Sequence, residues 1–107
     1  MLEKRRHRRL EVDLPVILRY KGRLLPATML NISCGGMLLR AEDPQILNDA
    51  QVEVIFDLDK KEKDISVRGK ILRATPTQDT TNIGVQFTNL FSMGNRSIEE
   101  YLGKNLN

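Results

Sequence analysis

Hydrophobic and polar residues alternate over residues 10–20, immediately after a basic N-terminal run. Charged residues such as Glu11 and Asp13 lie between the apolar ones. Because successive side chains of a strand point to opposite faces, this pattern predicts a β-strand with one buried face. Pro15 has no N–H for a ladder hydrogen bond and is therefore typical of an edge or a bulge. The predicted inward positions are Leu10, Val12, Leu14, Val16, Leu18 and Tyr20.

Later segments repeat this two-residue period and are separated by residues typical of turns. Lys21-Gly22-Arg23 predicts a tight turn, and NISCGG (31–36) predicts a hairpin bend. The charged run LDKKEKD (58–64) is typical of a solvated hairpin tip. The alternation predicts strands over about 24–32, 37–39, 51–58, 65–71 and 83–87.

The hydrophobic period changes near the C-terminus. Apolar side chains recur there at the spacing of one helix face, at Ile98, Tyr101, Leu102 and Leu106. A helix over about residues 92–106 is therefore predicted. Ser97 followed by Glu100 fits a capping box, and Ser92 and Asn95 are alternative starts. The apolar stripe needs a surface to cover, and the open end of a barrel supplies one.

Six short strands with hairpin spacing and one terminal helix predict a mainly β fold, a six-stranded antiparallel barrel with a C-terminal α-helix. The 107 residues suffice for one core, so we expect one domain over residues 10–107 and a basic arm over residues 1–9. Aromatic residues make up 5% of the chain, which leaves the core mostly to aliphatic side chains. The aromatic residues fall largely on predicted core faces: Tyr20, Phe56, Phe87, Phe91 and Tyr101.

Charge is distributed unevenly along the chain. The net charge is +3, yet residues 1–25 hold eight Lys or Arg against three acidic residues, a local net charge of +5. This asymmetry predicts an anionic partner near the N-terminus. The basic run KRRHRRL (4–10) alone fits a solvated arm, a nucleic-acid patch or a pocket for a phosphorylated ligand.

Enzymatic chemistry finds little support in the side chains present. His7 is the only histidine and lies among arginines, so no metal site is indicated. Cys34 is the only cysteine, and the pattern indicates no base to activate it. We therefore predict no enzyme, no metal and no cofactor. A lone cysteine cannot form an internal disulfide, which favours a cytoplasmic location, and no apolar run is long enough to span a membrane.

Two short motifs become informative when they are considered together. Arg5 and Arg9 form an R-x-x-x-R pattern, and Asn31, Ser33 and Gly36 form a [D/N]-x-S-x-x-G pattern after two intervening strands. In this order the motifs resemble the PilZ domain family, whose members are bacterial receptors for cyclic di-GMP. R-x-x-x-R alone occurs often by chance, but the pair is fairly specific. Three more segments resemble that family, so the likeness covers nearly the whole chain: LPVIL (14–18), GGMLL (35–39) and IGVQF (83–87).

The resemblance implies a split barrel of six strands followed by a helix, in agreement with the strand count. It also implies a cyclic di-GMP site with Arg5 and Arg9 on one wall. The opposite wall would consist of Asn31, Ser33 and Gly36. In this family the residue before the arginine motif influences whether one ligand or a stacked pair binds, and we expect the charge of Lys4 there to favour the pair. Further candidates for ligand contact are Lys4, which is that residue, and Arg6, Arg8 and Gly35.

The chemistry of a guanine nucleotide suits both motifs. An arginine fork donates to guanine O6 and N7 or to phosphate oxygens. The Watson–Crick edge of guanine presents N–H donors, for which Asn31, Ser33 and turn carbonyls supply acceptors. Gly36 would permit a positive φ and a close approach of ligand to backbone. Asn31 lacks the charge of an aspartate, so a lower affinity is expected.

We expect residues 1–9 to be mobile without ligand and to fold against Asn31–Gly36 when it binds. The arm would then change the surface that a monomer or weak homodimer presents to a protein target in trans, unless the chain belongs to a longer protein. One rival is a barrel that binds single-stranded nucleic acid, for which surface aromatics are few. The other is a PilZ-like adaptor without a ligand, and the intact motifs argue against it.

Overall fold

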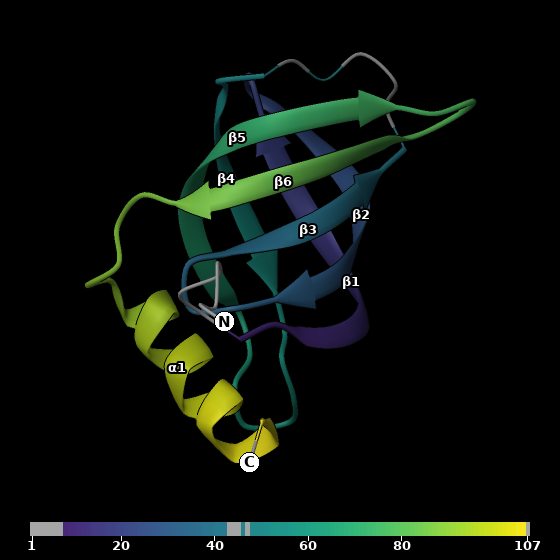
Figure 1. Cartoon of the computed structure of the whole chain (residues 1–107). Coiled ribbons are helices and arrows are strands. Elements are labelled where there is room, and N and C mark those ends of the chain that lie inside the picture. Colours follow the sequence, from purple (N-terminus) through teal and green to yellow (C-terminus); the bar gives the residue numbers. More distant parts are fainter. Residues whose placement is uncertain (1–7, 43–45, 47, 107) are drawn as a thin grey trace, which may run out of the picture.

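The computed structural model describes residues 8–42, 46 and 48–106. In this part of the chain six strands precede one helix (Figure 1). This confirms the predicted mainly β fold with a C-terminal helix. The elements are β1 (Leu10–Tyr20), β2 (Arg23–Ile32), β3 (Gly36–Ala41), β4 (Gln51–Phe56), β5 (Ile65–Pro76), β6 (Thr81–Phe87) and α1 (Met93–Asn105).

The strands form a closed barrel in the order β1-β2-β3-β6-β5-β4, and every neighbouring pair is antiparallel. Pairing of β1 with β4, from Val16 opposite Phe56 to Tyr20 opposite Val52, closes the ring. A register shift interrupts the pairing of β1 with β2 between Glu11 and Leu14. Such irregularities bend a strand, as closure requires. Pro15 follows this shift and precedes the pairing with β4, in agreement with its predicted place beside a bulge.

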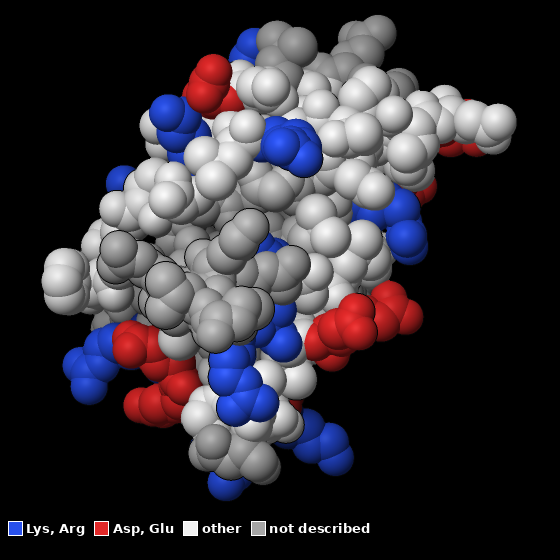
Figure 2. All heavy atoms as spheres, viewed as in Figure 1, with Lys and Arg blue, Asp and Glu red and all other residues white. Residues whose placement is uncertain are grey.

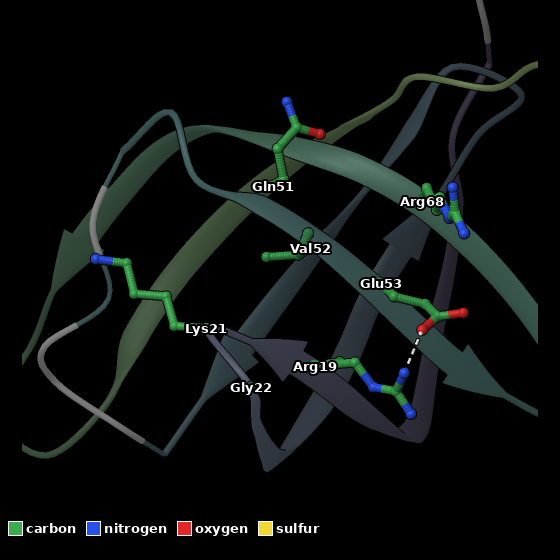
Figure 3. Close-up of a pocket in the computed structure, with 7 residues that line it drawn as sticks. All are labelled: Arg19, Lys21, Gly22, Gln51, Val52, Glu53 and Arg68. Carbon is green, nitrogen blue, oxygen red and sulfur yellow. Dashed lines mark ion pairs between the residues drawn. The ribbon is translucent and has the colours of Figure 1, made fainter.

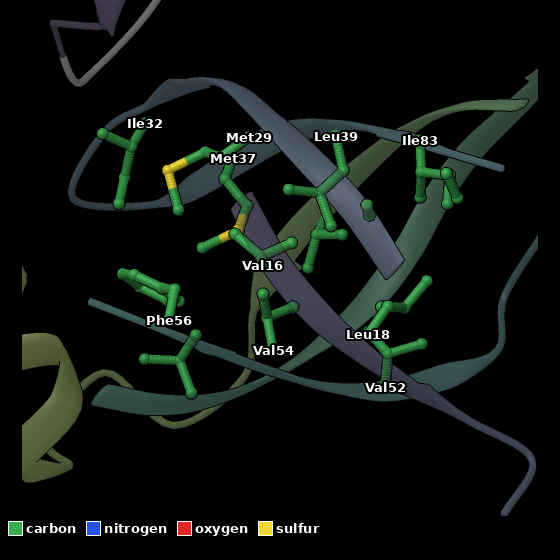
Figure 4. Packing of buried hydrophobic residues seen from close by; sticks show 14 of the residues in the cluster. Val16, Leu18, Met29, Ile32, Met37, Leu39, Val52, Val54, Phe56 and Ile83 are labelled. Atoms are coloured by element: carbon green, nitrogen blue, oxygen red, sulfur yellow. The ribbon is translucent and has the colours of Figure 1, made fainter. Parts of the chain in front are cut away.

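The inward side chains of all six strands form one hydrophobic core (Figure 4). Leu18, Met29 and Leu39 are completely buried, and the core is mainly aliphatic as predicted. Tyr20, Phe56 and Phe87 are also buried. Phe91 is not, because it lies 95% exposed in the segment between β6 and α1. The alternation of β6 ends at Phe87, so strand periodicity could not place Phe91.

Ser92, one of the alternative starts, is the N-cap of helix α1, and the predicted capping box at Ser97 and Glu100 is wrong. The Ser92 hydroxyl accepts a hydrogen bond from the Asn95 N–H at 3.2 Å, which satisfies a donor of the first turn. Ile98 and Leu102 are buried in the barrel core, so the predicted apolar stripe covers the barrel end as expected (Figure 1). The described part of the chain contains no helix with the length and apolarity that a membrane crossing requires.

Truncating a fully buried side chain should destabilise the barrel. We expect Leu18→Ala to lower the free energy of unfolding by about 2–5 kcal/mol, because the surrounding core cannot close the cavity. Leu72→Ala is the matched control, since Leu72 lies on β5 and is 55% exposed. Its effect should stay within about 0.5 kcal/mol. Chemical denaturation measures both, and equal losses in the two variants would contradict the packing described.

Candidate functional site

The turn between β2 and β3 is held together by the hydroxyl of Ser33. The backbone N–H groups of Gly35 and Gly36 both donate to Ser33 Oγ, each at 3.2 Å. Ser33 Oγ donates to the Gly36 carbonyl at 3.3 Å, and the Ser33 N–H donates to the same carbonyl at 2.8 Å. Ser33 is 5% exposed. Its hydroxyl therefore shapes the bend, and in this geometry its donor and both acceptor positions are in use.

Gly36 is required by the neighbouring strand. A Cβ at this position would overlap the backbone carbonyl oxygen of Val85, on the strand β6 that pairs with β3. Gly36 does not have a positive φ, so the conformational freedom expected of this glycine is not used here. The Phe87 N–H also donates to the Gly35 carbonyl at 2.9 Å, which fastens the turn to β6. Close packing of β3 against β6 accounts for this glycine.

Arg9 reaches the second motif directly. Arg9 Nη1 donates to Asn31 Oδ1 at 2.8 Å, and the two residues are 22 positions apart in the sequence. The antiparallel register explains the contact, because Leu10 pairs with Ile32 and Glu11 pairs with Asn31. Arg9 is exposed and Asn31 is half-buried, so solvent reaches the contact. The two motifs thus meet in space at these residues.

The other predicted basic residues divide between described and undescribed parts of the chain. Arg8 is described and exposed, next to Arg9. Lys4, Arg5 and Arg6 lie outside the described residues, so their contribution to a ligand site stays a prediction.

Glu99 of helix α1 acts electrostatically on Cys34 in the turn, an effect that sequence reasoning did not predict. Partial burial raises the pKa of the Cys34 thiol, and the negative charge of Glu99 raises it further. A raised pKa lowers the fraction of reactive thiolate, and Cys34 packs partly buried against the core, which fits a packing role. The helical period predicted a helix around Glu99, but no sequence signal indicated which turn of the barrel it would approach.

Basic and acidic side chains are interspersed on the face that carries the lower end of the barrel (Figure 2). The described residues include no group of three or more His, Cys, Asp and Glu side chains that could hold a metal ion. The candidate site therefore consists of the Arg9 guanidinium, the Asn31 side-chain amide and the Ser33–Gly36 turn.

Comparison with known proteins identifies a family. The model of the PilZ domain matches residues 3–104. A search of curated proteins found no matching sequence.

Three solved structures share the fold. The inhibitor of motility MotI/DgrA of Bacillus subtilis has a TM-score of 0.77 at 15% identity, over 98% of this chain and 52% of that one. The PilZ domain of YcgR from Escherichia coli with c-di-GMP has a TM-score of 0.76 at 14% identity, over 95% and 91% of the two chains. PlzA of Borreliella burgdorferi in complex with c-di-GMP has a TM-score of 0.66 at 17% identity, over 92% and 40%. This chain thus spans about half of MotI/DgrA and less of PlzA.

The reason given for Gly36 can be tested by adding one methyl group. We expect Gly36→Ala to destabilise the fold by about 1–3 kcal/mol, because β6 must move away from the new Cβ. Gly84→Ala is the matched control on the paired strand, since a Cβ there meets no atom within 4 Å. Thermal unfolding measures the difference. A stable Gly36→Ala variant would show that the turn does not pack as described.

The effect of Glu99 on Cys34 is measurable through thiol reactivity. A raised pKa means less thiolate at a given pH, so reaction with a disulfide reagent should gain its rate at higher pH than in an unfolded chain. We expect Glu99→Gln to shift the pH–rate profile of Cys34 towards lower pH, because it removes a neighbouring negative charge. Glu100→Gln changes the next helix residue and serves as control. Identical profiles for the two variants would exclude the proposed proximity effect.

Proposed function

This chain belongs to the PilZ domain family, and on that premise we propose that it is a receptor for cyclic di-GMP. The observation that carries the proposal is the hydrogen bond between Arg9 and Asn31, which joins the two motifs beside the Ser33 turn. Support also comes from two structures of the same fold, those of YcgR and PlzA, which contain c-di-GMP.

Arg9 would supply donors to the ligand. Its guanidinium carries five N–H groups, so the bond to Asn31 leaves most of them for guanine or phosphate oxygens. Arg5 would extend this wall, with Lys4, Arg6 and Arg8 as additional cations. A site that holds two stacked dinucleotides would use this extra charge against four phosphates.

Asn31 would supply an acceptor. Its Oδ1 has two lone pairs, one of which accepts from Arg9, so the other can accept from a guanine N–H. Ser33 and Gly36 would contribute to the site by fixing the shape of the turn. The Ser33 hydroxyl shapes the bend, and Gly36 lets the bend pack against β6. Gly35 and the neighbouring carbonyls would present backbone groups to the ligand.

The signalling part of the proposal concerns residues 1–9. Ligand would draw this arm against the Asn31–Gly36 turn and so alter the surface offered to a protein target in the cytoplasm. The receptor would work without enzymatic chemistry or a further cofactor, as a monomer or weak homodimer.

A single-strand nucleic-acid barrel fits the side chains less well. Such proteins stack successive bases on aromatic rings along a basic groove. Three of the five aromatic residues are buried in the core, Tyr101 is half-buried, and Phe91 alone among them is fully exposed. One exposed ring does not make a stacking platform.

Titration calorimetry with cyclic di-GMP tests the proposal, with GTP and cyclic GMP as control ligands. We expect binding of the dinucleotide alone, with a stoichiometry that distinguishes one ligand from a pair. Arg9→Ala should weaken binding by about ten- to a hundredfold, because hydrogen bonds to charged groups contribute about 1.5–3 kcal/mol.

Arg40→Ala removes an exposed arginine from β3 and should leave the affinity unchanged. Absence of dinucleotide binding by the unaltered chain would refute the receptor and favour the adaptor. Equal affinities of Arg9→Ala and Arg40→Ala for cyclic di-GMP would show that Arg9 does not contact the ligand.

A further inference from the structure

The alternation that fills the core also defines the outer face of three adjacent strands. Arg19 of β1 lies opposite Glu53 of β4, which lies opposite Arg68 of β5. The same registers align Ile17, Ile55 and Ser66 in the next row. These six residues, with Lys21 and Gln51 beside the first row, form what we call the basic–apolar face. Its two rows differ in chemistry.

The first row borders a basic groove of about 380 Å³ (Figure 3). Its charged lining residues are Arg19, Lys21, Arg68 and Glu53. Arg19 Nη1 lies 3.3 Å from Glu53 Oε1, and Ser66 donates a hydrogen bond to the same carboxylate. Arg68 has no carboxylate partner within the described residues, and Lys21 Nζ lies 5.5 Å from the Tyr20 ring centroid. The groove therefore retains positive charge after its internal ion pair forms.

The second row borders an apolar hollow of about 240 Å³. Pro15, Ile17 and Ile55 contribute to its wall. Ile17 is 40% exposed. On the adjacent strand β2, Leu24 is 61% exposed and pairs with Arg19, while Pro26 pairs with Ile17. Apolar side chains that cluster on a solvent-facing sheet, bordered by cations, are typical of a protein interface.

We propose that the basic–apolar face binds an acidic amphipathic segment of a partner protein. Carboxylates of that segment would meet Lys21 and Arg68, and its apolar side chains would cover Ile17, Ile55 and Leu24. Residues 16–20 of β1 and residues 52–56 of β4 are paired with a strand on each side, so they offer no free edge for an added strand, and the partner must contact side chains. A nucleic acid would leave the apolar row largely uncovered, whereas a protein segment can offer both carboxylates and apolar side chains, so a protein segment fits better.

This face is separate from the proposed ligand site. Arg9 precedes the part of β1 that pairs with β2 alone, whereas Arg19 lies near the end of β1, where the strand also pairs with β4. The inference therefore stands whether or not the chain binds cyclic di-GMP, and its test contains no dinucleotide.

The test follows backbone amide NMR signals of the full chain during titration with designed peptides. The probe is an amphipathic peptide of about 18 residues with leucines on one helical face and glutamates on the other. Two matched peptides replace all glutamates by lysine or all leucines by serine, and a single-stranded oligonucleotide is the fourth probe. We expect saturable shifts from the acidic amphipathic peptide alone, centred on Ile17, Arg19, Glu53, Ile55 and Arg68.

Charge reversal on the face should weaken this binding. We expect the double variant Lys21→Glu with Arg68→Glu to raise the Kd at least about tenfold, because like charges then face each other. Arg40→Glu with Arg73→Glu reverses two exposed cations on β3 and β5 outside the face and should change the Kd less than about threefold. All four side chains are exposed, and thermal unfolding checks that both variants remain folded.

Three outcomes would overturn the proposal. The first is an acidic peptide that causes no saturable shifts on this face. The second is equal weakening by the two double variants, which would indicate nonspecific attraction. The third is an oligonucleotide that shifts the same amides and displaces the peptide, which would assign the groove to a polyanion.

Discussion

Pairing of β1 on both of its sides is the constraint on which the rest of the molecule depends. Its pairing with β2 brings Arg9 to Asn31, and its pairing with β4 closes the barrel. Closure pairs the two edge strands over residues 16–20 of β1 and directs alternate side chains into one core. The register shift between Glu11 and Leu14 makes both pairings possible, because a strand can bend at such an irregularity between its first part, beside β2, and its last part, beside β4.

The turn itself is held by its own hydrogen bonds and by β6. Ser33 bonds within the bend, Gly36 packs without a side chain against Val85, and the Phe87 N–H donates to the Gly35 carbonyl. A rigid acceptor surface lowers the entropy that a ligand must overcome on binding. Arginine side chains lose much more freedom when they are ordered. The proposed site would thus combine a turn held by its own hydrogen bonds with long arginine side chains whose freedom binding would reduce.

Sequence patterns predicted the elements better than their contacts. Alternation predicted the strands, and the order of the motifs led to the meeting of Arg9 with Asn31. The start of the helix was ambiguous because Ser92 and Ser97 are both plausible caps. In the structure Ser92 is the cap, and Gly94 in the first helical turn packs closely against Ser66 on β5, a contact that the sequence pattern does not reveal. A glycine is needed at position 36 because β6, a strand far along the chain, packs against it. Local turn chemistry suggested a positive φ instead, because it holds no information about that strand.

The two proposed surfaces use β1 in different ways. Near Arg9 the strand is irregular and only its partner β2 is paired with it, whereas near Arg19 it is paired on both sides. A closed ladder around a densely packed core resists small continuous deformations. A dinucleotide at the Arg9 end would therefore change the molecule mainly by ordering residues beside the turn, with little distortion of the distant basic–apolar face. Regulation of a partner would then require that partner to extend along β1 and contact both ends.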